Sequence, residues 1–339
     1  MANDTMRALQ ARAFGLEALH LAERPIPRPR RGEIKLRVRA ASLNYRDLVV
    51  LSGKYMPNLP LPYVPASDAC CDVVEVGEDV TRFQVGDRVA PVFIQGWHDG
   101  MPTQEQRTKR TLGAPLGGVL QDYVVVPAED AVAAPAHLSD AEVATLPIAA
   151  LTAWSTLAEG GIKAGDVVLA QGTGGVALFA MQFAKLMGAF AIITSSSDDK
   201  LARARELGAD VGINYRARPD WDQAVREATQ GRGADIIVET SGATMAQSLA
   251  ALAFGGFIGV VGFVAGMEAV LPVRQFIMPM ARVQGIAVGS RARFEAMNRA
   301  MTLHTLRPVV DASFPLERAA DAFRLMQRGG HFGKIVITI

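Results

Sequence analysis

One segment, Asp166-Val-Val-Leu-Ala-Gln-Gly-Thr-Gly-Gly-Val-Ala177, sets the architecture of this chain. Its short apolar run is typical of a buried strand, and the G-x-G-x-x-A turn that follows opens a segment with helical spacing at about 175–187. Gly172 and Gly174 allow a tight turn and let backbone amides approach a pyrophosphate, while Ala177 permits close helix–strand packing. The start of the helix also favours negative charge. In this context the pattern indicates a dinucleotide-binding turn, and the alternative is a plain loop of an α/β protein.

The alternation of apolar strands and amphipathic helices continues downstream and predicts a six-stranded parallel sheet of βαβ units. The expected strands are 166–171, 189–195, 211–214, 235–240, 257–261 and 283–288, and the expected helices lie at about 175–187, 199–207, 221–229 and from Thr244. The first 135 residues instead hold β-type segments broken by Pro and Gly, at 33–40, 69–76, 88–93 and 121–127. These predict an irregular, mostly antiparallel β domain, so the fold class is α/β.

After Gly289 the pattern leaves the parallel sheet. It predicts a helix at 294–304, an extended segment at 308–314, a helix at 316–327 and a terminal strand at 334–339. Because this last strand does not continue the order of the parallel sheet, we expect it to rejoin the N-terminal domain. The domains are then 1–148 with 289–339, and a nucleotide-binding domain at 149–288 inserted between those two segments.

Composition excludes several classes of protein. Half of the 339 residues are hydrophobic, and 35 Lys plus Arg stand against 34 Asp plus Glu, so nucleic acid is not an expected partner. The two cysteines, Cys70 and Cys71, are adjacent, and the five histidines show no metal-binding spacing, which argues against a disulfide framework and a four-cysteine zinc site. Residues 1–14 lack the apolar core of a signal peptide, and the uncharged run 249–267 holds five glycines, which disfavours a membrane helix. We expect a cytoplasmic protein.

The end of the second predicted strand bears on the choice of coenzyme. An NAD-preferring site usually places an acidic side chain there to accept a hydrogen bond from the ribose 2′-hydroxyl. This chain instead reads Thr194-Ser195-Ser196-Ser197, and hydroxyls do not repel a 2′-phosphate. Lys200 and Tyr215 can donate to that phosphate, so NADP(H) is favoured. The alternative is that the serines cap a helix starting at Asp198 or Asp199 and that Lys200 is a solvated charge, and capping is compatible with binding.

Together these motifs resemble the medium-chain dehydrogenase/reductase superfamily over essentially the whole chain. The matching pieces occur in the expected order: Pro29–Ile34, Ala41–Asp47, Val76-Gly77, Val85–Val89, Leu146-Pro147, Leu151–Trp154, Gly172–Ala177, Glu206–Asp210 and Gly333–Val336. The resemblance implies a GroES-like β domain plus an inserted Rossmann domain, which is a doubly wound six-stranded parallel sheet. It also implies hydride transfer to or from NADP(H) in a cleft between the two lobes.

The resemblance further implies a set of coenzyme contacts. The positions that match nicotinamide and ribose contacts are Thr152, Gly262, Phe263, Val264, Val288 and Lys334, with ordinary domain packing as the alternative. Adding the turn and the end of the second strand gives the predicted NADP(H)-binding set: Thr152, Gly172, Gly174, Gly175, Val176, Ser195, Ser196, Lys200, Tyr215, Ser241, Gly262, Phe263, Val264, Val288 and Lys334. Gly262 is expected to let the coenzyme approach because it has no side chain.

Departures from the zinc enzymes of this superfamily are equally informative. The zinc alcohol dehydrogenases carry Cys where Asn44 stands, Gly-His-Glu where Ala66-Ser67-Asp68 stands, and Cys or Asp near Ile148. Their structural zinc lobe is replaced by the segment 95–118, a polar loop broken by Gly and Pro that we expect to wall the active site. No metal is therefore predicted. The chain is similar to the zinc-free, quinone-oxidoreductase-like branch at Ser42–Asp47 and Gly53–Tyr55.

A reductase without zinc needs a substrate that is already electrophilic. A quinone or an α,β-unsaturated carbonyl requires only orientation and one or two donors to the oxygen where negative charge develops. The catalytic candidates are Asn44, Asp47 and Tyr55. If Tyr45–Leu51 is a short helix, Asn44 and Asp47 can face the same side of it. The phenol of Tyr55 could donate to a substrate oxygen or relay a proton.

Two of these candidates have simpler alternatives. Asn44 could serve as a helix N-cap, a role that is compatible with substrate contact. Asp47 could form an ion pair with a nearby arginine such as Arg46 or Arg88.

The predicted substrate pocket comprises Phe93, Trp97 and His98, at the end of a predicted strand and in the loop that should cover the substrate. Aromatic side chains there would form an apolar pocket for planar molecules. His98-Asp99 is an alternative acid–base pair, although a lone His in a polar loop is more often a surface group.

The leading hypothesis is an NADPH-dependent reductase of quinones or α,β-unsaturated carbonyls that works without a catalytic zinc. One alternative is an alcohol dehydrogenase or carbonyl reductase of the same superfamily, with Tyr55 or His98 as the acid–base group. Another is a sensor or scaffold that binds NADPH with little turnover. The resemblance also suggests a homodimer, with 257–264 and 276–280 as candidate contacts, although the same residues could be core.

Overall fold

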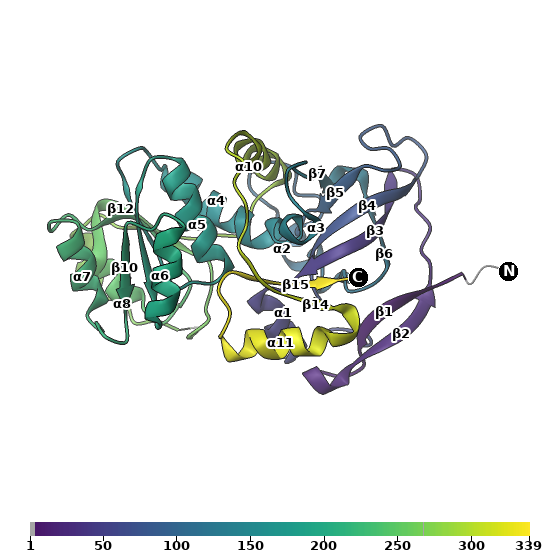
Figure 1. The fold of residues 1–339 in the computed structure, drawn as a ribbon, viewed down its shortest axis with the longest axis horizontal. Helices are drawn as coiled ribbons and strands as arrows, with labels where there is room; N and C mark the ends of the chain where they lie inside the picture. The colour runs from purple at the N-terminus through teal and green to yellow at the C-terminus, as the bar shows by residue number, and fades with distance from the viewer. Residues whose placement is uncertain (1–3, 267) are drawn as a thin grey trace. The chain divides into compact units, whose positions relative to one another are not determined.

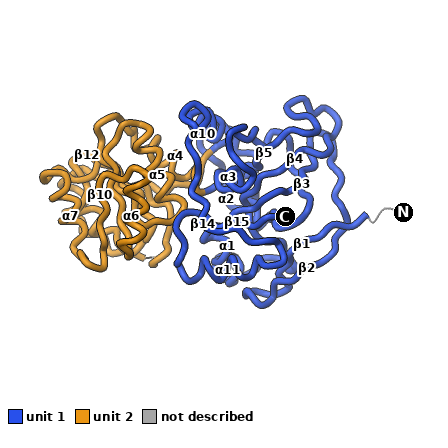
Figure 2. Tube along the Cα trace, in the orientation of Figure 1, with its two compact units in different colours: residues 1–148, 290–339 blue, residues 149–289 orange. Residues whose placement is uncertain are grey.

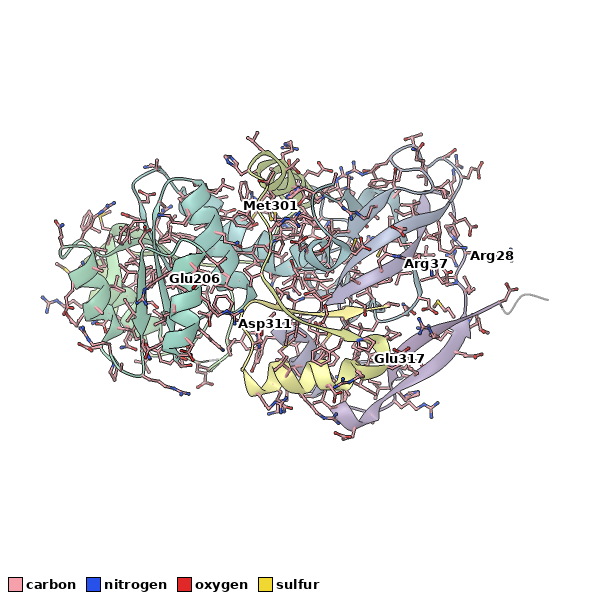
Figure 3. All side chains as sticks on the ribbon, in the orientation of Figure 1. Arg28, Arg37, Glu206, Met301, Asp311 and Glu317 are labelled. Atoms are coloured by element: carbon pink, nitrogen blue, oxygen red, sulfur yellow. The ribbon has the colours of Figure 1, made fainter. Side chains whose placement is uncertain are left out.

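The structure is a computed structural model and describes residues 4–266 and 268–339. The chain forms two compact units: the first unit is residues 1–148 with 290–339, and the second unit is residues 149–289 (Figure 2). The boundary after the second unit lies one residue later than the boundary predicted from the sequence, because Gly289 belongs to the second unit. Charged side chains such as Glu206 in the second unit and Glu317 in the first are exposed (Figure 3).

Six parallel strands form the sheet of the second unit: β8 (Val167–Ala170), β9 (Phe190–Ser195), β10 (Val211–Asn214), β11 (Ala234–Glu239), β12 (Leu252–Val260) and β13 (Arg282–Gly285). Their order is β10-β9-β8-β11-β12-β13. Figure 1 labels two of these strands, β10 and β12. The order reverses next to β8, as in doubly wound nucleotide-binding sheets, and confirms the predicted Rossmann fold. Helices α4 (Leu151–Gly160), α5 (Gly175–Leu186), α6 (Asp198–Glu206), α7 (Trp221–Ala228) and α8 (Met245–Ala251) pack on this sheet.

The helix that follows the glycine-rich turn is fixed by aromatic packing. All four residues of β8 are buried, as expected for a strand covered on both faces. On α5, the rings of Phe179 and Phe183 stack with centroids 5.8 Å apart, and Phe183 meets Trp154 of α4 edge-on at 5.3 Å. Burial of each phenylalanine ring contributes ~2 kcal/mol, so the start of α5 and the turn before it are held in place.

The first unit is a mostly antiparallel β domain, as predicted. Its main sheet has the order β14-β15-β3-β4-β5-β7, with β6 paired to β3. These strands are β3 (Glu33–Ser42), β4 (Asp68–Val76), β5 (Arg88–Pro91), β6 (Tyr123–Pro127), β7 (Ala131–Ala133), β14 (Val310–Pro315) and β15 (Lys334–Thr338). β15 pairs antiparallel with β3, with Val336 opposite Ser42, so the terminal strand rejoins the N-terminal domain as expected.

Helices and one hairpin complete the first unit. The helices are α1 (Tyr45–Leu51), α2 (Gln104–Lys109), α3 (Asp140–Val143), α10 (Arg291–Leu303) and α11 (Ala319–Arg328). The hairpin of β1 (Thr5–Ala11) and β2 (Leu19–Pro25) was not predicted. Along β3, the side chains of Ile34, Leu36 and Val38 are buried and alternate with less buried ones, which is the pattern of a strand with one face on the core.

Several predicted boundaries were wrong. The predicted strand 88–93 ends at Pro91, and the strand predicted at 257–261 already begins at Leu252. The last strand of the parallel sheet does not reach Val288, whose φ of +65° is incompatible with an extended strand. The loop 95–118 contains α2, which begins where the Thr103 hydroxyl accepts from the Gln106 backbone N–H.

The uncharged run 249–267 is not a continuous helix. Its described part contains the end of α8 and then β12, while Met267 lies outside the described residues. Within residues 4–266 and 268–339, every helix is too short or too polar to cross a membrane.

Candidate active site

The start of α1 places two of the predicted catalytic side chains together. Asn44 has extended φ and ψ and is the N-cap residue, and Asp47 is the third residue of the helix. The Asp47 carboxylate accepts a hydrogen bond from the Asn44 backbone N–H at 2.8 Å. An acidic residue in the first turn also suits the positive end of a helix. The helix Tyr45–Leu51 and the N-cap position of Asn44 are therefore confirmed.

The Asn44 amide is bonded at both ends within the first unit. Its Nδ2 donates to Asp68 Oδ2 at 2.9 Å, and its Oδ1 accepts from Lys334 Nζ at 2.7 Å. Lys334 also donates to the Leu43 carbonyl at 2.6 Å, and Asp68 Oδ2 accepts from the Ile148 N–H at 3.1 Å. Asn44, Asp47, Asp68 and Lys334 are each at most 8% exposed. We call these four residues the buried polar cluster.

Burial governs the protonation of this cluster. Desolvation raises the pKa of Asp68 to about 7, although the Lys334 ammonium and the Asn44 amide act in the opposite direction. Desolvation likewise raises the pKa of Asp47 to about 6, although the hydrogen bond from the Asn44 N–H lowers it. The pKa of Lys334 is lowered, mainly by burial. The Oδ1 atoms of both carboxyls have no hydrogen-bond partner among the described residues. The cluster can therefore take up or release a proton near neutral pH.

The donor set at this place does not fit a zinc ion. At the four positions that match the zinc ligands of the resembling enzymes, the side chains are an amide, a hydroxyl, a carboxylate and an aliphatic chain, at Asn44, Ser67, Asp68 and Ile148. No group of three His, Cys, Asp or Glu side chains able to hold one metal ion occurs within residues 4–266 and 268–339. The Asn44 amide is in addition already bonded to an ammonium and a carboxylate.

Arg46 brings the predicted residues Tyr55 and Phe93 together. Its guanidinium lies 5.4 Å from the centroid of the Tyr55 ring and 5.0 Å from that of Phe93. It also donates to Thr111 Oγ1 at 3.3 Å, to the Leu112 carbonyl at 3.4 Å, and to the Ala114 carbonyl. The loop 95–118 is thus tied to α1 beside Tyr55, whose side chain is 43% exposed.

The proposed ion pairs of Asp47 were wrong. Arg46 is engaged with the loop, and Arg88 pairs with Asp140 at 3.2 Å. Asp47 is instead buried and held by a backbone N–H. One oxygen of this carboxylate is bonded by the backbone at the start of its own helix, which the sequence alone did not indicate.

The suggested His98–Asp99 pair was also wrong. His98 Nε2 lies 2.9 Å from Asp130 Oδ1, whereas Asp99 accepts from the Gly100 N–H. Trp97 is buried, and its indole N–H donates to the Gly100 carbonyl at 2.9 Å. The structure thus places Trp97 in the packing of its own loop. The role of Phe93, Trp97 and His98 as a substrate pocket stays a prediction.

In the second unit, the glycine-rich turn has the features of an anion-binding loop. Gly172 has a φ of +83°, and a Cβ built on Gly172 or Gly174 would meet no atom within 4 Å, so the backbone there faces open space. Gly174 is the N-cap of α5, and no side chain in the described part of the chain caps this helix. The first-turn amides are therefore available to a phosphate, and the residues present fit a dinucleotide. Gly175 and Val176 begin α5 as predicted.

The end of β9 lies beside this turn. The Gly172 N–H donates to Thr194 Oγ1 at 3.1 Å, and the hydroxyls of Thr173 and Ser195 are 3.5 Å apart. Tyr215, exposed, follows β10 and donates its backbone N–H to the Ser195 carbonyl at 3.0 Å. Three residues of the predicted coenzyme site, Gly172, Ser195 and Tyr215, thus lie close together.

The alternative role of the serines is confirmed for one of them. Ser197 is the N-cap of α6 and accepts from the Lys200 N–H at 3.4 Å. Asp198 opens that helix, and its carboxylate accepts from Asn214 Nδ2 at 3.0 Å. The assignment of Ser195, Ser196, Lys200 and Tyr215 to a 2′-phosphate stays a prediction.

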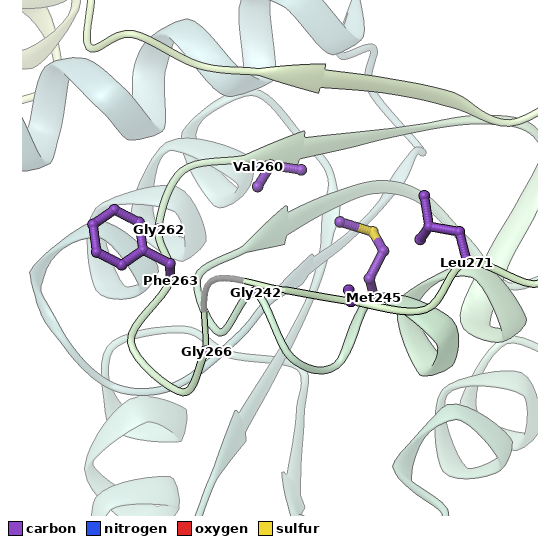
Figure 4. A pocket seen from close by; sticks show the side chains of 8 residues that line it. Gly242, Met245, Val260, Gly262, Phe263, Gly266 and Leu271 are labelled. Carbon is purple, nitrogen blue, oxygen red and sulfur yellow. The ribbon is translucent and has the colours of Figure 1, made fainter.

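The segment predicted to contact the nicotinamide surrounds a small apolar cavity. Ser241 and Val264 are close in space, because the Thr240 carbonyl accepts from the Val264 N–H at 3.2 Å and the Ser241 carbonyl accepts from the Ala265 N–H. A cavity of about 300 Å³ lies here (Figure 4). It is lined by Gly242, Met245, Val260, Gly262, Phe263 and Leu271, among others. A Cβ on Gly262 would lie 2.9 Å from the Thr240 carbonyl, so packing within the chain already requires this glycine.

Three further coenzyme assignments have structural roles of their own. Thr152 is buried on α4, where its carbonyl accepts from Thr156 Oγ1 at 2.7 Å. Val288 has the left-handed backbone described above. The Lys334 ammonium is bonded to Leu43 and Asn44 inside the first unit. Coenzyme contact by these three residues stays a prediction.

The sequence interpretation missed two buried residues, Gln171 and Glu239. Gln171 directly precedes the glycine-rich turn, and Glu239 is the last residue of β11. Their side chains are joined by a hydrogen bond of 2.8 Å. The only signal was a lone acidic residue at the end of an apolar strand, which is also typical of a solvated strand end.

Comparisons with known proteins identify the family. The alcohol dehydrogenase GroES-like domain family matches residues 30–136, and the zinc-binding dehydrogenase family matches residues 175–302. A zinc-type alcohol dehydrogenase-like protein of Schizosaccharomyces pombe is 42% identical over 317 residues, which are 91% of each chain. This chain belongs to the medium-chain dehydrogenase/reductase superfamily. It is therefore an oxidoreductase of a family that binds nicotinamide coenzymes.

Solved structures of relatives agree in fold and differ in coenzyme. A candidate alcohol dehydrogenase of Sinorhizobium meliloti 1021 is 44% identical, with a TM-score of 0.94 and full coverage of both chains. An NAD-dependent alcohol dehydrogenase is 35% identical, with a TM-score of 0.88 and coverage of 98% and 100%. A 2-octenoyl-CoA carboxylase reductase, solved with NADP and 2-octenoyl-CoA, is 27% identical, with a TM-score of 0.89 and coverage of 100% and 88%.

Proposed function

We propose that this protein is an NADP(H)-dependent oxidoreductase that transfers hydride to a quinone or an α,β-unsaturated carbonyl without a catalytic zinc. The observation that carries the proposal is the hydrogen-bonded series Asp68–Asn44–Lys334, in which Asn44 stands where the resemblance places a zinc ligand. An amide held between a carboxylate and an ammonium is a poor zinc ligand. A substrate that arrives electrophilic does not need one.

The residues of the second unit supply the coenzyme site in this proposal. The uncapped start of α5 and the open backbone at Gly172 and Gly174 receive the pyrophosphate. Ser195 and Ser196 add no negative charge where a 2′-phosphate would lie, and Lys200 supplies a positive one. The bound coenzyme supplies the hydride.

The residues of the first unit act on the substrate oxygen. Negative charge develops there during conjugate reduction, so a hydrogen-bond donor stabilises the transition state. The exposed phenol of Tyr55, oriented by Arg46, is the candidate donor. The buried polar cluster at the start of α1 is the candidate proton reservoir, because burial raises the pKa of Asp47 to about 6 and that of Asp68 to about 7.

One solved relative supports this reaction type. The 2-octenoyl-CoA named with the carboxylase reductase is an α,β-unsaturated thioester, and that enzyme was solved with NADP. The second candidate is an alcohol dehydrogenase or carbonyl reductase, which is favoured by the names of the other relatives, one of them NAD-dependent.

A paired assay separates the two candidates. Purified protein is given NADPH or NADH with a quinone, an enone or a simple aldehyde, and the oxidation of the coenzyme is followed. The proposal expects turnover of the quinone or the enone with NADPH. Turnover of the aldehyde alone favours the second candidate. Tight NADPH binding with no turnover of any of these electrophiles would mean that the protein is a coenzyme-binding sensor or scaffold.

A further inference from the structure

Glu239 is a buried carboxylate surrounded by hydrogen-bond donors. It ends β11 and has no exposed surface. Its Oε1 accepts from the Ser241 and Gly242 N–H groups at 3.0 Å each and from Thr244 Oγ1 at 3.1 Å. Its Oε2 accepts from Gln171 Nε2 at 2.8 Å and from the Ser248 hydroxyl. Five donors thus converge on one side chain.

These donors explain why the side chain is a carboxylate and not an amide. A buried charge is tolerated when enough donors satisfy it. If an NH₂ group replaced one of these oxygens, it would face another hydrogen-bond donor, either the Gln171 side-chain amide or the backbone N–H groups of 241 and 242. A buried donor left without an acceptor costs more than the hydrogen bond itself.

The carboxylate connects two strand ends that matter for the coenzyme. Gln171 directly precedes Gly172. Its side-chain Oε1 accepts from the Thr240 backbone N–H at 3.3 Å, and its backbone carbonyl accepts from Thr240 Oγ1 at 3.1 Å. On the other side, Glu239 fixes the turn in which Gly242 has a φ of +80°. The glycine-rich turn after β8 and the Ser241 segment after β11 are therefore set relative to each other by the Gln171–Glu239 pair.

We propose that Glu239 is a positioning residue for the nicotinamide coenzyme. This inference rests on the proposed function, since it assumes that the turn at Gly172 receives a coenzyme. Glu239 does not touch the coenzyme in this account. It holds the backbone amides of the turn in the binding geometry before the coenzyme arrives, so that little ordering is left to do on binding.

Direct titration of NADPH tests this proposal. Glu239→Gln should raise the NADPH Kd about tenfold, the effect of one lost charge-assisted hydrogen bond in the site. The double variant Glu239→Gln with Gln171→Glu exchanges the two side chains, so the pair again contains one carboxylate and one amide. This double variant should recover most of the NADPH affinity. Leu249→Ala is the matched control, because Leu249 is buried in the same unit on α8 and has no part in the network.

The control separates positioning from general stability. Leu249→Ala should lower the melting temperature while leaving the NADPH Kd within about twofold of the unaltered protein. Equal affinity of Glu239→Gln and the unaltered protein would overturn the inference and leave the proposed function standing. The same holds if both variants lose affinity in proportion to their loss of melting temperature. If the unaltered protein binds neither NADPH nor NADH, both the inference and the proposed function are overturned.

Discussion

The Lys334 ammonium lies 2.7 Å from the Asn44 side-chain oxygen, although 290 positions separate the two residues in the sequence. This contact joins the last strand of the chain to the start of α1. It places a buried positive charge one amide away from Asp68, whose carboxylate binds the other end of Asn44. A zinc enzyme of this superfamily would have a metal ligand at position 44. Here the same position belongs to a hydrogen-bonded series that ends in a lysine.

Removing the ammonium should destabilise the first unit. Lys334→Met keeps the length of the side chain but leaves Asn44 Oδ1, the Leu43 carbonyl and the Asp68 charge without their cation. Loss of one partner from a buried charged network costs ~3 kcal/mol or more. Urea unfolding should show this decrease as a lower free energy of unfolding. Lys185→Met is the control: its partner Asp210 is partly exposed, and a loss there should stay below ~1 kcal/mol. Equal losses for the two variants would contradict this account of the cluster.

Stability should fall as the pH rises from about 4 to about 7. Folding raises the pKa of Asp47 to about 6 and that of Asp68 to about 7 from the ordinary aspartate value of 3.8, so the folded protein binds more protons than the unfolded chain in this window. The free energy of unfolding therefore decreases with rising pH until both carboxyls are ionised in the folded state. Asp68→Asn should flatten this dependence, as chemical denaturation at several pH values would reveal. An unchanged slope would show that Asp68 does not titrate there.

The sequence carried most of the fold because the deciding signals are local. The strand–turn–helix at 166–187 and the six parallel strands follow from apolar runs, glycines and short loops, and they were predicted within a few residues. The hairpin of β1 and β2 was missed because polar and charged side chains interrupt the apolar pattern of both strands. Val288 was wrongly assigned to the last strand of the parallel sheet, because nothing in the sequence indicates that a valine adopts a left-handed backbone conformation.

The site was predicted less completely, because its contacts join distant segments. Asn44 and Asp47 were found since they lie one helical turn apart. Nothing local shows that Lys334 bonds to Asn44, or that Glu239 bonds to Gln171 across 68 positions. The sequence likewise did not indicate that Asp130 is the partner of His98. Such pairs are set by the register of strands that are far apart in the chain.

Coenzyme preference should respond to the end of β9. Ser196→Asp places a carboxylate where a 2′-phosphate is expected, so the NADPH Kd should rise at least tenfold by charge repulsion. NADH lacks that phosphate, and its Kd serves as the internal control, since it should stay level or fall. Fluorescence titration of both coenzymes measures the ratio. A variant that weakens both coenzymes equally would show that Ser196 lies elsewhere.

Tyr55→Phe should impair turnover and leave coenzyme binding intact. The variant keeps the ring that packs on Arg46 and removes only the phenol. If the phenol donates to the substrate oxygen, kcat should fall by a factor on the order of 100, the usual range for one general acid or oxyanion donor. Steady-state kinetics with an enone and direct NADPH titration check the two halves. Unchanged kcat would remove Tyr55 from the mechanism.

The most direct test of the zinc-free account is to measure the metal content and the enone reductase activity of one preparation, before and after treatment with a zinc chelator. The account predicts far less than one zinc ion per chain and the same rate of NADPH oxidation after chelation. One zinc per chain, together with activity that disappears on chelation and returns when zinc is added back, would contradict it.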